Sequence, residues 1–131
     1  MRVIKIGKVP FKEKRFMLTE KDYCDKDLSD TLKDLGFPTK ITFIGEQATI
    51  EIPINSGQIS LYEAQKWLRE EKGMLLQPTY LELSDEWICV IRDKNKRHGY
   101  SAQKQKDYEE ALSEGVRASI KILQDEQKEN N

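Results

Sequence analysis

The sequence has few of the residues that metal, disulfide and membrane proteins depend on. Its 131 residues include two cysteines and one histidine. A zinc site built from Cys and His takes four ligands and a disulfide framework takes several cysteine pairs, so the composition excludes both. No apolar run approaches the ~18 residues that a membrane-spanning helix needs, and residues 1–5 do not begin a signal peptide. We therefore expect a cytoplasmic protein that crosses no membrane.

The chain also lacks a large net charge of either sign. Lys and Arg number 22 and Asp and Glu 23, which gives a net charge of −1 and argues against a uniformly basic nucleic-acid binder. Charge is nevertheless segmented, because residues 1–18 carry six basic side chains against Glu13 and residues 92–106 carry six against Asp93. Such segments can orient an anionic partner. The simpler interpretation is that they solvate the surface.

No motif of a known enzyme chemistry is present. His98 lies in a basic stretch, Cys24 has no recognisable flank, and Cys89 lies in an apolar run where cysteine usually acts as a small hydrophobe. Gly45 and Gly57 are isolated, so no glycine-rich phosphate loop is formed. The sequence therefore predicts no catalytic residue, cofactor or metal ligand. A small enzyme without a recognisable motif remains an alternative.

Helices are expected in three segments, each preceded by a residue that can cap a helix. The caps are Asp25 or Asp27, Ser60 with Glu63 three residues on, and Asp107 with Glu110. The helices run from these caps to about residues 35, 72 and 123, and the first two end at Gly36 and Gly73. Gly115, near Ala118 and Ser119, predicts a close approach of the third helix to a sheet.

Strands are expected in the remaining apolar segments: 3–6, with 16–18 as a second candidate, 41–44, 50–54, 80–83 and 87–91. In 50–54 isoleucines alternate with polar residues or proline, which predicts one buried and one solvated face. Trp87–Ile91 is apolar on both faces, which favours a central strand covered on both sides. Residues 93–106 are predicted to be a loop or a frayed helix start.

These elements give the order β(β)-α-β-β-α-β-β-α, which is typical of an α+β fold. We predict a twisted, mainly antiparallel sheet with three helices packed on one face. Residues 1–123 form a single domain in this interpretation, and residues 124–131 form a polar tail.

Two groups of residues are candidate contact surfaces. The basic segment 92–106 could grip phosphates and stack a base through Arg92, Lys94, Lys96, Arg97, His98 and Tyr100, or it could be a solubilising loop. The second helix presents Tyr62, Trp67 and Arg69, residue types that are enriched at protein interfaces. The alternative for this group is that Trp67 packs on the core and Arg69 is solvated.

Three segments carry a resemblance to a known group of proteins: Asp27–Phe37, Leu61–Glu70 with its Ala-x-x-Trp-Leu-Arg pattern, and Tyr108–Leu112 followed by Gly115. In these the chain resembles small uncharacterised proteins of phages and prophages of gut bacteria. The resemblance brings no activity and no site residues, and it implies an accessory protein of a mobile element. We therefore expect a non-enzymatic binding protein that engages or inhibits a host protein, such as a defence protein. Nucleic-acid binding is the alternative function, and the sequence leaves open whether the protein forms a homo-oligomer.

Overall fold

The computed structural model describes residues 18–54, 57–94, 99–101 and 103–129. The chain follows the order η3 (Glu20–Asp22), α1 (Lys26–Asp34), β1 (Lys40–Ile44), β2 (Thr49–Pro53), α2 (Leu61–Lys72), β3 (Met74–Leu81), β4 (Glu86–Asp93), β5 (Gly99–Ser101) and α3 (Tyr108–Glu129). The fold is α+β, as predicted. The strands form two antiparallel sheets, β1-β2 and β3-β4-β5, where the sequence led us to expect one. The expected strand at 3–6 and all but Leu18 of the candidate at 16–18 lie outside the described residues.

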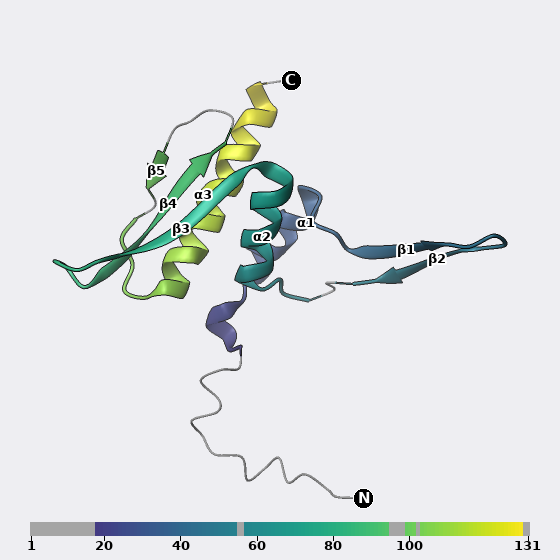
Figure 1. Cartoon of the computed structure of the whole chain (residues 1–131), viewed down its shortest axis with the longest axis horizontal. Coiled ribbons are helices and arrows are strands. Elements are labelled where there is room, and N and C mark those ends of the chain that lie inside the picture. Colours follow the sequence, from purple (N-terminus) through teal and green to yellow (C-terminus); the bar gives the residue numbers. More distant parts are fainter. Residues whose placement is uncertain (1–17, 55–56, 95–98, 102, 130–131) are drawn as a thin grey trace, which may run out of the picture.

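The core lies between the three-stranded sheet and the helices (Figure 1). Helix α3 packs on β3 and β4, α2 packs on β3, and α1 packs against α3. The core is lined by residues from every helix and from both long strands, namely Leu28, Leu32, Leu61, Ala64, Leu68, Met74, Leu76, Cys89, Ile91, Leu112, Val116 and Ile120. One face of this sheet is therefore covered by helices.

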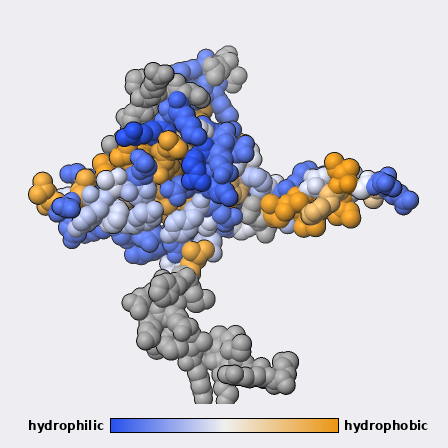
Figure 2. All heavy atoms as spheres, viewed as in Figure 1, coloured by the Kyte–Doolittle hydropathy of each residue, from blue (hydrophilic) through white to orange (hydrophobic). Residues whose placement is uncertain are grey.

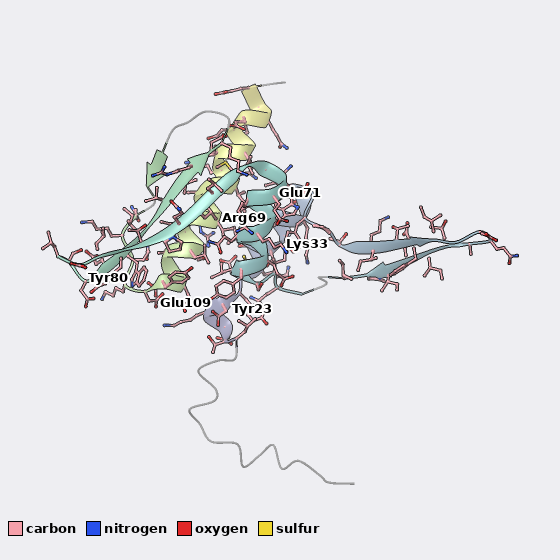
Figure 3. All side chains as sticks on the ribbon, in the orientation of Figure 1. Tyr23, Lys33, Arg69, Glu71, Tyr80 and Glu109 are labelled. Atoms are coloured by element: carbon pink, nitrogen blue, oxygen red, sulfur yellow. The ribbon has the colours of Figure 1, made fainter. Side chains whose placement is uncertain are left out.

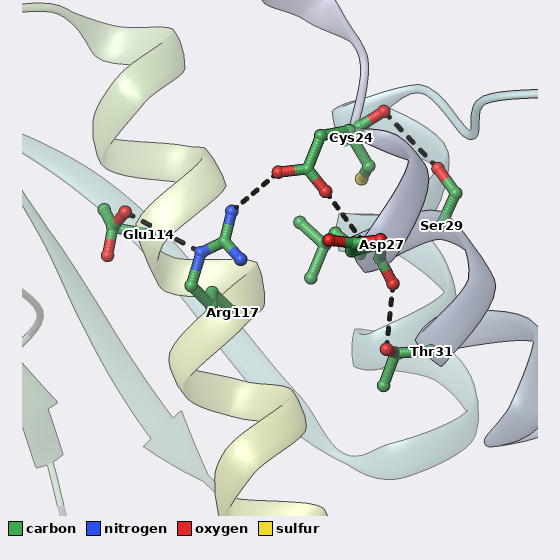
Figure 4. A network of polar contacts seen from close by, with 8 residues as sticks. Cys24, Asp27, Ser29, Thr31, Glu114 and Arg117 are labelled. Atoms are coloured by element: carbon green, nitrogen blue, oxygen red, sulfur yellow. Dashed lines mark hydrogen bonds and ion pairs between the residues drawn. The ribbon is translucent and has the colours of Figure 1, made fainter.

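The helices begin and end where local sequence dictates. Oδ1 of Asp25 accepts a hydrogen bond from the Leu28 amide at 2.8 Å, and the Ser60 hydroxyl accepts from the Glu63 amide at 3.1 Å. Each satisfies an amide that the first helical turn leaves without an intrahelical partner. Gly73 ends α2 with φ +70°, a left-handed conformation that favours glycine. The predicted caps of α1 and α2 are confirmed, and Figure 4 shows the contacts around the α1 cap.

Strand β4 lies at the centre of the three-stranded sheet, as predicted. Cys89 and Ile91 are buried against the helices, whereas Ile88 and Val90 on the other face are half-buried. Among the described residues helices cover one face of β4, and the half-burial of Ile88 and Val90 shows that the predicted cover of the second face is only partial. Pro78 falls on β3, an edge strand, where its missing N–H leaves no ladder bond unmade.

Three boundaries differ from the sequence-based expectation. Strand β3 begins at Met74, directly after α2, and pairs along its whole length with β4. Residues 99–101, predicted as loop, form β5 through pairing with residues 90–92. Helix α3 continues to Glu129, so most of the predicted tail is helical. For β5 and α3, pairing or continuation of regular structure extends past the apolar pattern on which the prediction depended, whereas the start of β3 is itself apolar, with Met74 and Leu76 buried, and was missed.

Gly115 brings α3 close to β4, as predicted. A Cβ atom at this position would overlap the Cys89 thiol and lie 3.0 Å from the Cys89 Cβ. Glycine therefore sets the distance between helix and sheet at this point.

Candidate protein-interaction site

The β1–β2 hairpin projects from the body of the molecule (Figure 1). Its strands pair in the register Ile41 with Ile52 and Phe43 with Ile50. The Gly45 amide bonds the Ala48 carbonyl at 2.9 Å in the turn, and the Ile54 amide bonds the Thr39 carbonyl at 2.8 Å at the base. The hairpin is thus hydrogen-bonded along its length, and every residue of both strands is exposed.

Residues opposite each other in a ladder share a face, so one face of the hairpin is apolar. This apolar face consists of Ile41, Phe43, Ile50 and Ile52, whose exposed fractions lie between 44% and 58%. The sequence predicted the hairpin and its apolar face but expected that face to be buried, and this expectation is wrong. Figure 2 shows hydrophobic residues gathered along the hairpin, and Figure 3 shows its side chains standing clear of the helices and the other sheet.

The opposite face is largely polar. Thr42 lies opposite Glu51, and the Lys40 ammonium contacts Oε1 of Glu51 at 3.1 Å. Ile44, 83% exposed, lies beside the turn. The hairpin is therefore amphipathic, with a solvated face and a face suited to burial.

A shallow groove of about 320 Å³ lies where the hairpin meets α2. Phe37, Pro38, Ile54 and Trp67 form its apolar part, and its rim carries Glu63, Lys66, Glu70 and Glu71. The Trp67 ring packs edge-on against Phe37 with 5.6 Å between centroids, and the Lys72 ammonium lies 5.3 Å from the Trp67 ring centre. The groove thus joins an aromatic floor to a mostly acidic rim at the foot of the apolar face.

The predicted protein contacts Tyr62, Trp67 and Arg69 do not form one surface. Helical geometry of ~100° per residue places Tyr62 and Arg69 on one side of α2 and Trp67 on the other. The Tyr62 hydroxyl donates a hydrogen bond to Asp22, so this side chain joins two elements of the fold. Arg69, labelled in Figure 3, is exposed. Its guanidinium lies 3.9 Å from the Glu70 carboxylate. Trp67 is half-buried and lines the groove.

The predicted nucleic-acid contacts are only partly described. Arg92 and Lys94 are exposed at the end of β4, and Tyr100 lies in β5 opposite Ile91. Lys96, Arg97 and His98 lie outside the described residues. Among the described residues only Arg92 and Lys94 of this group have described side chains, so the nucleic-acid contact stays a prediction.

Neither cysteine is activated. Cys24 and Cys89 are buried, and desolvation raises the pKa of the two thiols to about 12 and about 11, so each is a neutral thiol near pH 7. Within the described ranges no group of His, Cys, Asp and Glu side chains is arranged to hold a metal ion. In the same part of the chain, no helix is long and apolar enough to span a membrane.

No protein-family model, curated protein or solved structure matches the chain.

The residues of the apolar face were missed as a site because alternation identifies an apolar face without saying what covers it. One signal in the sequence favours exposure. The second pair of strands, Tyr80–Leu83 and Trp87–Ile91, already offers the helices a sheet to pack on, which leaves the first hairpin without a helix of its own.

Proposed function

We propose that this protein is a non-enzymatic binding protein that engages another protein through the apolar face of the β1–β2 hairpin. The resemblance noted above supports the further proposal that this is a mobile-element accessory protein that engages a host protein, a defence protein among the candidates. The observation that carries the proposal is the exposure of Ile41, Phe43, Ile50 and Ile52 on one face of a projecting hairpin.

The energetics favour a covered hairpin. An isolated two-stranded hairpin is marginally stable in water and gains stability when its apolar face packs on another surface. Burial of apolar surface contributes about 25 cal/mol per Å², so covering four half-exposed side chains is a substantial driving force for association. Contiguous apolar patches with a polar rim are typical of protein interaction sites.

The surroundings of the apolar face indicate which partner surface fits it. The groove rim at its foot carries three glutamates and one lysine. An apolar partner surface flanked by basic side chains therefore matches both the hairpin and the groove, because complementary charge at a rim steers association and suppresses wrong partners.

The test is capture from bacterial lysate with a matched set of variants. Immobilised wild type is compared with Phe43→Ser/Ile50→Ser, which removes the centre of the apolar face, and with Leu83→Ser, which removes a fully exposed apolar side chain of the other hairpin. We expect the wild type and Leu83→Ser to retain the same partner and the double variant to lose it. The purified partner should then bind the double variant at least tenfold more weakly than the wild type.

Two outcomes would contradict the proposal. A partner that is retained equally by all three proteins binds elsewhere. A partner lost after nuclease treatment of the lysate would favour nucleic-acid binding, which Arg92→Glu/Lys94→Glu and a steep salt dependence would then confirm.

A further inference from the structure

The hairpin has two outer edges, one on β1 and one on β2, and only the β1 edge has a backbone N–H at every outward-facing residue. The hydrogen bonds at Gly45–Ala48 and Thr39–Ile54 fix the alternation along the ladder, so the peptide groups of Ile41 and Phe43 face β2. Those of Lys40, Thr42 and Ile44 therefore face outward. On β2 the outward groups belong to Thr49, Glu51 and Pro53, and Pro53 has no N–H.

We infer that a second copy of this chain pairs with the outer edge of β1, antiparallel and with Thr42 opposite Thr42. The inference rests on the proposed function, since it takes the hairpin as the binding element. It identifies a second copy of the chain as one partner of the hairpin. In this register Lys40 pairs with Ile44 of the second copy and Thr42 with its own equivalent. All three outward peptide groups of each strand are then used, in pairs that each exchange two hydrogen bonds.

The side chains suit this pairing. Thr42 opposite Thr42 and Ile41 opposite Phe43 are cross-strand pairs of the kinds that stabilise antiparallel sheets. Lys40, the one charged residue of β1, lies opposite Ile44, so no like charges meet across the ladder. The chain carries a net charge of only −1, and two copies therefore repel each other weakly.

The pairing also enlarges the surface offered to a partner protein. The two-fold axis of such a pair stands perpendicular to the sheet, so both apolar faces lie on the same side of a four-stranded β2-β1-β1-β2 sheet. Four half-exposed side chains offer on the order of 400 Å², about half of the ~800 Å² that each partner contributes to a standard interface. Two hairpins side by side reach that size.

Sedimentation velocity from about 1 µM to about 500 µM tests the pairing, a range that detects moderate affinities. We expect the wild type to approach twice the mass of one chain. Thr42→Pro removes an outward N–H of β1 and leaves the hairpin ladder intact, so it should raise the dimer dissociation constant more than tenfold. The control Glu51→Pro, directly across the hairpin, removes an outward N–H of β2 and should dimerise as the wild type does.

A covalent test holds even if a proline disturbs the hairpin. Hydrogen-bonded antiparallel pairs have Cα atoms ~5.5 Å apart, within disulfide range, so Thr42→Cys should form a covalent dimer on mild oxidation and Glu51→Cys should not. The buried native cysteines do not compete. A wild type that stays monomeric, or equal cross-linking at both positions, overturns the inference. Partner capture by a monomeric wild type would overturn the dimer and leave the proposed function standing. A dimer whose partner capture does not depend on the hairpin would support the dimer and contradict the proposed function.

Discussion

The hydroxyl of Tyr62 on α2 donates a hydrogen bond of 2.5 Å to Oδ1 of Asp22, which lies in η3. Oδ2 of the same carboxylate accepts from the Thr19 amide at 2.8 Å. These bonds hold the pKa of Asp22 below its usual range, the Tyr62 bond having the largest effect. Burial, together with the neighbouring carboxylate, raises the pKa of Tyr62. One side chain of α2 thus anchors the first described segment of the chain.

Breaking this contact should destabilise the fold in a pH-dependent way. We expect Tyr62→Phe to lower the free energy of unfolding by about 1–2 kcal/mol at pH 7, because the bond is to a charged group. The folded pKa of Asp22 is depressed, so its stabilisation is present above the unfolded pKa and is lost as pH falls through the folded value. Urea titrations should therefore show the difference between wild type and Tyr62→Phe shrinking below about pH 4.

Tyr80→Phe is the matched control for this experiment. The Tyr80 hydroxyl also donates to an aspartate, Asp85, at 2.6 Å, but the pair lies five residues apart in an exposed turn. We expect little change in stability at any pH. Equal effects of the two substitutions would show that the Tyr62 bond has no anchoring role.

The approach of α3 to β4 predicts an unusual response to a glycine substitution in a helix. Gly115→Ala would normally stabilise a helix by ~1 kcal/mol. Here the new Cβ overlaps the Cys89 thiol, so we expect a net loss of about 1–3 kcal/mol from overpacking. Adding Cys89→Ala should recover part of that loss, and a double-mutant cycle by urea unfolding measures the coupling. Additive effects would show that the two residues do not meet.

The helices and the second hairpin were predictable because their signals are local. Asp25 and Ser60 cap through amides three residues away, and Gly73 ends α2 through its own backbone conformation. Strand β5 was not predictable, because Gly99–Ser101 has no apolar alternation and becomes a strand only by pairing with β4. Such pairing joins residues that the sequence keeps apart.

The candidate site likewise has one feature that the sequence predicts and one that it does not. The register of Ile41 with Ile52 and Phe43 with Ile50 follows from alternation and the intervening turn, which the sequence contains. Whether an apolar face is covered depends on the rest of the fold, and here α2 and α3 pack on the other sheet. Trp67 is the opposite case: the sequence suggested a candidate interface residue, and in the fold its ring is half-buried against Phe37.

The core assignment predicts that a charge at its centre unfolds the protein. Leu32 and Leu112 are fully buried, so Leu32→Asp or Leu112→Asp places an unpaired carboxylate among apolar side chains. We expect either variant to lose its cooperative thermal transition, measured by circular dichroism. Leu83→Asp, at a fully exposed position, should melt as the wild type does. A cooperative melt near the wild-type temperature for Leu112→Asp would show that α3 does not pack as described.

Asp25 allows the contributions of a helix cap and an ion pair to be separated. Its Oδ1 caps α1, and its Oδ2 lies 3.0 Å from the Arg117 guanidinium of α3 (Figure 4). Both side chains are about half exposed, a setting in which ion pairs contribute little. Asn also caps well, so Asp25→Asn should cost less than ~0.5 kcal/mol, whereas Asp25→Ala loses the cap and should cost about 1 kcal/mol by urea unfolding. If Asp25→Asn costs as much as Asp25→Ala, the bond to Arg117, and not the cap, holds the start of α1 in place.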